Sequence, residues 1–199
     1  MAVTKLQPAA AVEAALAAGV TLFGENRLDE VAEKQASFRG AELHLIGHLQ
    51  RNKVRQAAEL VTCVESIDKI ETAEALARRC AVLGRRMGIL LELNTSGAPT
   101  QSGFRSREEL LAALEGILAL EALQVRGLMT IAPISEEPER IRAAFRSTRS
   151  LFEELRERYP ALGIELLSMG MSGDFELAVE EGSTLVRIGS ALFGSRSAT

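Results

Sequence analysis

Short, mainly apolar runs alternate with longer amphipathic segments along the whole chain. Eight runs have the length of a strand: 2–5, 20–26, 43–47, 63–67, 88–94, 125–131, 164–170 and 184–190. Between them, apolar residues recur every three or four positions, as in helices, over 8–18, 27–38, 50–60, 69–83, 106–120 and 136–158. Apolar strands joined by helices predict a parallel sheet that is covered by helices.

The number of these units predicts the fold class. Eight strand and helix units in 199 residues favour an α/β protein, a (β/α)8 TIM-type barrel, with an open doubly wound sheet as the alternative. Gly19 and Gly163 precede predicted strands and Gly88 stands at the very start of one, where we expect the three glycines to end helices or to turn loops. No linker, internal repeat or low-complexity tract interrupts the pattern, so we expect residues 1–199 to form a single domain.

Composition narrows the class of protein. Hydrophobic residues make up 47% and charged residues 25%, as in globular proteins, and a net charge of −4 without a basic block argues against nucleic-acid binding. No apolar run approaches the ~20 residues of a membrane span. Cys63 and Cys80 are too few for a disulfide scaffold, and His44 is expected to be hydrogen-bonded inside the barrel rather than to bind metal with His48. These features predict a cytoplasmic protein without a membrane segment or a metal site.

Closure of the barrel would bring the two ends of the chain together. The last strand would then lie about 4.8 Å from the first. Because side chains alternate along a strand, Lys5 and Arg187 would both point inward near the C-terminal mouth, where such barrels carry their sites. A neighbouring guanidinium and partial burial favour the neutral lysine amine, which can form a Schiff base. Position alone does not decide this, because a lysine at a strand end more often extends to solvent.

Small residues follow the last two predicted strands. Ser172 and Gly173 follow the seventh strand, and Gly189 and Ser190 follow the eighth. Backbone N–H groups can approach a ligand closely at such turns, and the loops after strands 7 and 8 are the recurrent phosphate site of this barrel. Either loop alone is explained by a glycine turn and a serine cap. Both loops together, beside an inward arginine, predict a phosphate site.

A Schiff-base lysine beside a phosphate site is consistent with two ligands. One is pyridoxal 5′-phosphate, whose ring nitrogen needs a partner that Arg187 can supply. The other is a phosphosugar cleaved by a lyase or aldolase, which needs acid and base groups that Glu25 and Asp174 could supply. The residues favour pyridoxal phosphate and leave the phosphosugar as an alternative.

Several blocks of the sequence resemble one known family, in this order: AVTK, FGEN, HLIGHLQRNK, SGF, RGLMTI and LSMGMSGDFELAVEEGSTLVRIGSALFG. The family is that of the pyridoxal phosphate homeostasis proteins, single-domain relatives of the alanine racemase N-terminal barrel, and the resemblance spans nearly the whole chain. It implies a fold type III pyridoxal-phosphate protein. The cofactor-binding residues that it implies are Lys5, Asn26, Met171, Ser172, Arg187, Gly189 and Ser190.

The resemblance also implies a role for several of these residues. Lys5 would hold the cofactor as a Schiff base, Arg187 would face the pyridine nitrogen, and Ser172, Gly189 and Ser190 would bind the phosphate. A guanidinium does not readily give up a proton, so the ring nitrogen would stay unprotonated and the cofactor would be a weak electron sink.

The weak electron sink and the family resemblance together imply a role in cofactor homeostasis. The protein would carry or buffer pyridoxal phosphate for apoenzymes, with no catalytic residue. The alternative is a minimal amino-acid racemase. Racemases with this barrel add a second domain and a tyrosine, whereas Tyr159, the only tyrosine of this chain, ends a predicted helix.

Two features depart from the family pattern. The helix that usually precedes the first strand is lacking, so we expect an apolar patch on that flank and a monomer or weak homodimer. Gln101 stands where the family has the lysine of a Lys-Ser-Gly sequence. We expect Gln101 to lie at the surface, so that an anion contact of that lysine would be lost there.

Overall fold

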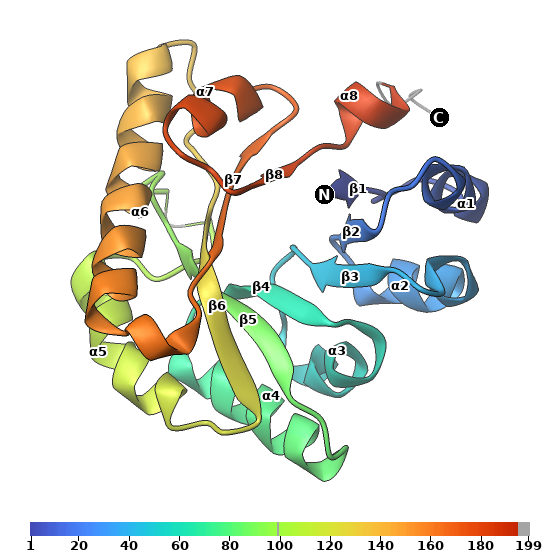
Figure 1. Cartoon of the computed structure of the whole chain (residues 1–199), viewed down its shortest axis with the longest axis horizontal. Coiled ribbons are helices and arrows are strands. Elements are labelled where there is room, and N and C mark those ends of the chain that lie inside the picture. The colour runs from blue at the N-terminus through green and yellow to red at the C-terminus, as the bar shows by residue number, and fades with distance from the viewer. Residues whose placement is uncertain (99, 195–199) are drawn as a thin grey trace.

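Eight parallel strands pair in the order of the sequence and curve into a nearly closed barrel (Figure 1). The structure is a computed structural model that describes residues 1–98 and 100–194. The strands β1 to β8 are Ala2–Val3, Leu22–Glu25, Glu42–Leu45, Cys63–Ile67, Met87–Leu93, Leu123–Thr130, Leu166–Met171 and Leu185–Arg187. The predicted α/β barrel is therefore confirmed, and the open doubly wound sheet is not found.

The two ends of the chain meet at the seam of the barrel. The backbone N–H of Val3 donates to Ile188 O at 2.8 Å, and the N–H of Ile188 donates to Met1 O at 3.0 Å. These bonds form a parallel bridge between Ala2 and Ile188, and Figure 1 shows the N-terminus beside β8. The prediction that the last strand lies beside the first is confirmed.

Helices cover the outside of the sheet. The α-helices α1 to α8 are Ala9–Ala17, Leu28–Lys34, Val54–Leu60, Ile70–Val82, Arg107–Leu118, Pro138–Arg158, Phe175–Glu180 and Ser190–Phe193. Each of the six predicted helices is present, but Gln35–Phe38 and Arg51–Lys53 are short 3₁₀ helices, η1 and η2, as is η3, Pro160–Leu162. Among the described residues, no helix combines the length and the apolar character needed to cross a membrane.

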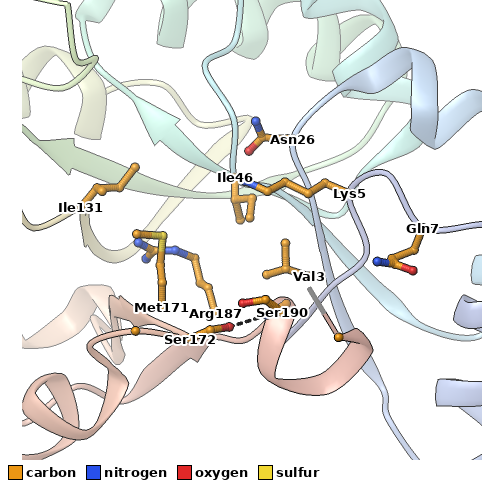
Figure 2. A pocket seen from close by; sticks show the side chains of 13 residues that line it. Val3, Lys5, Gln7, Asn26, Ile46, Ile131, Met171, Ser172, Arg187 and Ser190 are labelled. Carbon is orange, nitrogen blue, oxygen red and sulfur yellow. Dashed lines mark hydrogen bonds between the residues drawn. The ribbon is translucent and has the colours of Figure 1, made fainter. Parts of the chain in front are cut away.

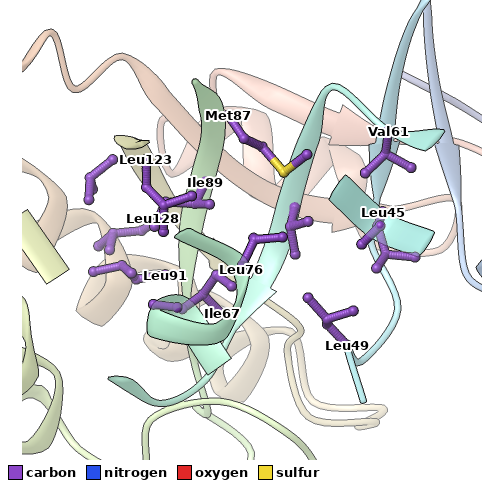
Figure 3. Packing of buried hydrophobic residues seen from close by; sticks show 14 of the residues in the cluster. Leu45, Leu49, Val61, Ile67, Leu76, Met87, Ile89, Leu91, Leu123 and Leu128 are labelled. Atoms are coloured by element: carbon purple, nitrogen blue, oxygen red, sulfur yellow. The ribbon is translucent and has the colours of Figure 1, made fainter. Parts of the chain in front are cut away.

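The hydrophobic core lies between the sheet and the helices (Figure 3). In β5, Ile89 and Leu91 pack in one apolar cluster with Leu76 of α4. Because side chains alternate along a strand, Leu90 and Glu92 face the opposite side, which is the interior of the barrel. By the same alternation, polar side chains of other strands also lie in that interior, and they form the floor of the cavity at the carboxyl ends of the strands.

Glycines end two helical segments as predicted, and one prediction is wrong. Gly19 and Gly163 have positive φ angles of 91° and 66° after α1 and η3. Gly88, however, lies within β5, and the left-handed position after α4 belongs to Gly84, with φ 62°. A Cβ on Gly88 would lie 2.8 Å from Arg126 Cδ, so the glycine there makes room for a neighbouring side chain.

Candidate functional site

One cavity of about 290 Å³ opens at the carboxyl ends of the strands (Figure 2). All the residues predicted to bind a cofactor line it: Lys5, Asn26, Met171, Ser172, Arg187, Gly189 and Ser190. Gly173, which was predicted at the phosphate site, also lines it, and the lining residues that were not predicted are Val3, Gln7, Ile46, Ile131 and Gly194. The structure thus brings the seven residues together in a cavity of the size that small ligands occupy.

Lys5 lies in a tight turn just beyond the first strand. β1 ends at Val3, two residues earlier than predicted, and the N–H of Gln7 donates to Thr4 O at 3.0 Å. Leu6 has φ 61°, the one positive φ of a non-glycine residue in the described part of the chain. A left-handed leucine needs support from its surroundings.

A buried ion pair supplies this support from behind the turn. Lys34 Nζ, on α2, lies 2.6 Å from Glu25 Oε1 and donates to Thr4 O at 2.9 Å. Thr4 Oγ1 also donates to Glu25 Oε1 at 2.8 Å, and Glu30 Oε2 accepts from the N–H of Leu6 at 2.7 Å. The Glu25–Lys34 pair and Glu30 therefore hold the backbone on the two sides of Lys5.

Arg187 forms the floor of the cavity. Its side chain is 4% exposed, and its guanidinium donates to Ser168 Oγ at 2.7 Å and to Thr130 O at 2.8 Å. Burial lowers the pKa of this guanidinium, while Glu65 and Glu92 act in the opposite direction. An arginine has five N–H donors, so two bonds to the protein leave donors for a ligand.

Ser172 joins the two loops that were predicted to bind phosphate. Its Oγ accepts from the N–H of Gly189 at 3.2 Å and from the N–H of Ala191 at 3.3 Å. A Cβ at position 189 would lie 3.3 Å from Val3 O, so glycine allows β8 to pass close to β1. At Gly173, nothing lies within 4 Å of such a Cβ. The loops are tied together and leave open space beside them.

The lining residues fit an anionic ring compound. Lys5 and Arg187 are cationic, and none of the thirteen described lining residues carries a carboxylate. Ile46, Ile131 and Met171 present apolar surface around the polar groups (Figure 2). Two cations in a lining without a carboxylate attract negative charge, while the apolar side chains suit the faces of a ring.

Groups that an aldolase would need do not line this cavity. Glu25 lies behind the turn, paired with Lys34, and Asp174 Oδ1 accepts from the N–H of Met171 at 2.6 Å. Tyr159 Oη donates to Glu115 Oε1 at 2.6 Å, at the far end of α6. Glu25 and Asp174, considered as acid and base for phosphosugar chemistry, and Tyr159, considered for a racemase, therefore have structural partners outside the cavity.

Gln101 and His48 are two polar residues near the mouth of the cavity. Gln101 is half-buried, and its Nε2 donates to Ile131 O at 3.1 Å, so it is less exposed than the predicted surface position suggests. The side chain is long enough to reach a neighbouring strand end, which sequence spacing does not reveal. His48 Nδ1 lies 3.3 Å from Asp68 Oδ2, and His48 is not a lining residue of the cavity.

Glu92 is a buried carboxyl group in the barrel interior. It is 1% exposed, and Ser102 Oγ donates to its Oε1 at 2.9 Å. Burial and the nearby Asp68 together raise the pKa of Glu92 to about 7, against the bond from Ser102 and the charge of Arg187. The folded pKa exceeds the unfolded value, so this group favours folding below its unfolded pKa, and the contribution is lost as the pH rises through about 7.

Glu92→Gln is therefore expected to stabilise the protein at alkaline pH. Between pH 4 and pH 8.5 the variant should gain about 3 kcal/mol relative to wild type, because its amide does not ionise yet still accepts from Ser102. Urea denaturation at both pH values measures the difference. Glu157→Gln, at an exposed position, should show no such gain, and an equal gain in both variants would contradict the role of burial.

Comparisons with known proteins give the chain a family. The family model "Alanine racemase, N-terminal domain" matches residues 1–197. The pyridoxal phosphate homeostasis protein of Pseudomonas aeruginosa is 42% identical over 198 residues, which cover 98% of this chain and 84% of that protein. That of Aquifex aeolicus is 40% identical over 180 residues, covering 89% and 78%. The chain belongs to the pyridoxal phosphate homeostasis protein family. The resemblance predicted from the sequence blocks is thus confirmed.

Solved structures agree with this membership of the pyridoxal phosphate homeostasis family. PipY of Synechococcus elongatus, solved without pyridoxal phosphate, has a TM-score of 0.92 at 40% identity and covers 97% of this chain and 91% of its own. The structure of PipY with pyridoxal phosphate bound has a TM-score of 0.89. Alanine racemase of Clostridium difficile, 16% identical, has a TM-score of 0.79 over 99% of this chain and 55% of the racemase, and shows the fold alone.

Proposed function

We propose that this protein binds pyridoxal 5′-phosphate as a Schiff base with Lys5 and carries or buffers it for apoenzymes in the cytoplasm, residues 1–199 acting as one domain. One observation carries the proposal: a lysine and a buried arginine line an otherwise uncharged cavity at the carboxyl ends of the strands. The names of the curated relatives, and the bound pyridoxal phosphate in PipY, support it.

The residues of the cavity divide into three parts in this proposal. Lys5 supplies the amine, and Arg187 donates a hydrogen bond to the ring nitrogen. Ser172, Gly189 and Ser190 hold the phosphate, while Asn26 and Met171 line the ring. The bound cofactor supplies an aldehyde, whose condensation with the Lys5 amine forms a C=N bond and releases water.

Arg187 supports storage of the cofactor rather than turnover. A guanidinium does not readily lose its proton, so it donates to the ring nitrogen without protonating it. A ring with a neutral nitrogen withdraws electrons weakly, which disfavours the carbanion chemistry that pyridoxal enzymes perform. The proposal therefore includes no catalytic residue.

Reductive trapping tests the proposal. Pyridoxal phosphate is added to the purified protein, and borohydride then reduces the C=N bond to a stable secondary amine. We expect the mass of the reduced adduct on the peptide that contains Lys5, together with a visible absorption band before reduction. Both signals should disappear in Lys5→Ala.

A matched variant controls for non-specific reaction of lysines. Lys69 is exposed near the mouth, and Lys69→Ala should retain the adduct and the absorption band. An adduct that persists in Lys5→Ala, or that is spread evenly over the lysines, would contradict the proposal.

A further inference from the structure

A continuous hydrogen-bonded chain leads from the floor of the cavity through the barrel interior. Arg187 donates to Ser168 Oγ at 2.7 Å, and Ser168 Oγ lies 2.6 Å from Glu65 Oε2. Glu65 Oε1 lies 2.6 Å from His44 Nδ1, and His44 Nε2 lies 3.0 Å from Glu42 Oε1. The four strands β8, β7, β4 and β3 each contribute to this chain.

Most of the chain is removed from water. Arg187 is 4% and His44 1% exposed, and Glu65 and Ser168 are fully buried. At the other end, Glu42 is half-exposed and accepts from Arg126 at 2.9 Å, so the chain reaches solvent at the opposite end of the barrel. The sequence predicted that His44 is hydrogen-bonded inside the barrel, but neither its partners nor the link to Arg187.

The chemistry of the side chains sets the direction of each bond. Arginine only donates, so Ser168 accepts from Arg187 and must give its own hydrogen to Glu65. An ionised Glu65 only accepts, so His44 Nδ1 donates to it. Glu42 accepts from Arg126, and an ionised Glu42 requires that His44 Nε2 donates as well. His44 is thus an imidazolium in this arrangement, and the two carboxylates raise its pKa against the effect of burial.

The charges along the chain alternate in sign. Arg187 is positive, Glu65 negative, His44 positive and Glu42 negative, so these four groups compensate one another. Ser168 and Glu65 also hold the guanidinium in one orientation. Glu65 supplies the negative charge without which burial of an arginine would be strongly unfavourable. Arg187 does not exchange its protons, so the chain orients charge and does not relay protons.

We infer that Ser168, Glu65 and His44 are positioning residues that orient Arg187 at the floor of the cavity and thereby set the affinity for an anionic ring ligand. None of the three lines the cavity, so they act through the guanidinium. The inference rests on the proposed function, with pyridoxal phosphate as the ligand that is measured.

Loss of the His44 proton is expected to weaken binding. The neutral imidazole leaves the four groups with one net negative charge, which opposes an anionic ligand in a medium of low dielectric. The groups that face His44 are Glu42 on its own strand, Glu65 on β4 and, through Glu42, Arg126 on β6. On β4, burial keeps the Cys63 thiol neutral by raising its pKa, and on β2 the residue opposite His44 is Gly24.

Titration of the protein with pyridoxal phosphate tests the inference. Ser168→Ala should weaken binding about tenfold or more, because it removes the acceptor of a charged hydrogen bond. Ser168→Thr keeps the hydroxyl and should restore most of the affinity. Thr148→Val, a buried hydroxyl deletion on α6 that is remote from the cavity, should leave the affinity within twofold of wild type.

The pH dependence separates positioning from a general loss of structure. The affinity of wild type should exceed that of His44→Gln several-fold near pH 6.5, and the ratio should approach one as His44 loses its proton at higher pH. If Ser168→Ala does not fold, the pH dependence of the affinity ratio between wild type and His44→Gln is the deciding measurement. A ratio that stays constant with pH, or normal binding by Ser168→Ala, would overturn the inference. Absence of binding by wild type would instead contradict the proposed function.

Discussion

Lys34→Met is expected to lower the free energy of unfolding by about 3–5 kcal/mol. The substitution leaves the Glu25 carboxylate in the core without its cation, since Glu25 is fully buried and Lys34 is 8% exposed. Removal of one member of a buried ion pair lowers stability far more than replacement of both members by apolar residues. Addition of Glu25→Leu to Lys34→Met should therefore recover a large part of the loss. Urea denaturation of the two variants and wild type measures both effects.

A second ion pair of equal length provides the matched control. Lys53 Nζ lies 2.6 Å from Asp29 Oδ1, as Lys34 Nζ does from Glu25, but Lys53 is 36% and Asp29 68% exposed. Lys53→Met should cost about 1 kcal/mol or less. Equal losses in Lys34→Met and Lys53→Met would show that burial does not set the energy of the Glu25 pair.

The same substitution should also disturb the turn that carries Lys5. Lys34 Nζ donates to the carbonyl groups of Thr4 and Gln7, on either side of Lys5. Without these bonds the left-handed Leu6 loses part of its support. Reductive trapping with pyridoxal phosphate should accordingly be slower in Lys34→Met than in Lys53→Met.

Arg187→Met is expected to cost about 3–5 kcal/mol of stability and to abolish measurable binding of pyridoxal phosphate. The methionine leaves Thr130 O and Ser168 without their donor and leaves the buried Glu65 with one cation fewer. Arg187→Lys keeps the charge, but a single ammonium cannot reproduce the two-pronged geometry, so we expect an intermediate stability.

Denaturation midpoints and ligand titrations measure these effects. Arg156→Met is the control, because Arg156 is 53% exposed and pairs with Glu153 at the surface. It should leave both stability and binding nearly unchanged. Retention of wild-type affinity by Arg187→Met would exclude a role for the guanidinium in the cavity.

The fold and part of the site could be predicted from local pattern and from alternation, whereas Asn26 and Met171 were implied only by the resemblance to the family. Eight apolar runs separated by helices define the barrel. Its closure then brings residue 5 to residue 187, whatever the details of packing. Small residues after the last two strands could be assigned to the same mouth for this reason.

The supporting contacts could not be predicted, because they depend on register and side-chain length. Lys34 lies on a helix whose amphipathic pattern gives no sign of a partner thirty residues earlier, at Thr4. Glu65 and Ser168 are joined across more than a hundred residues, and each looks ordinary in its own strand. Gly88 was misplaced because strand limits shift by a residue or two when β5 begins at Met87.

The seam between β8 and β1 gives the cavity a further property. β5 and β6 pair along the whole of β5, whereas β8 meets β1 at an isolated bridge between Ala2 and Ile188. Lys5 and Arg187 stand on opposite sides of that bridge, nearly a full chain length apart in sequence. A ligand held by both acts as a cross-link between the two ends of the polypeptide, so that occupancy of the cavity and closure of the barrel become coupled equilibria.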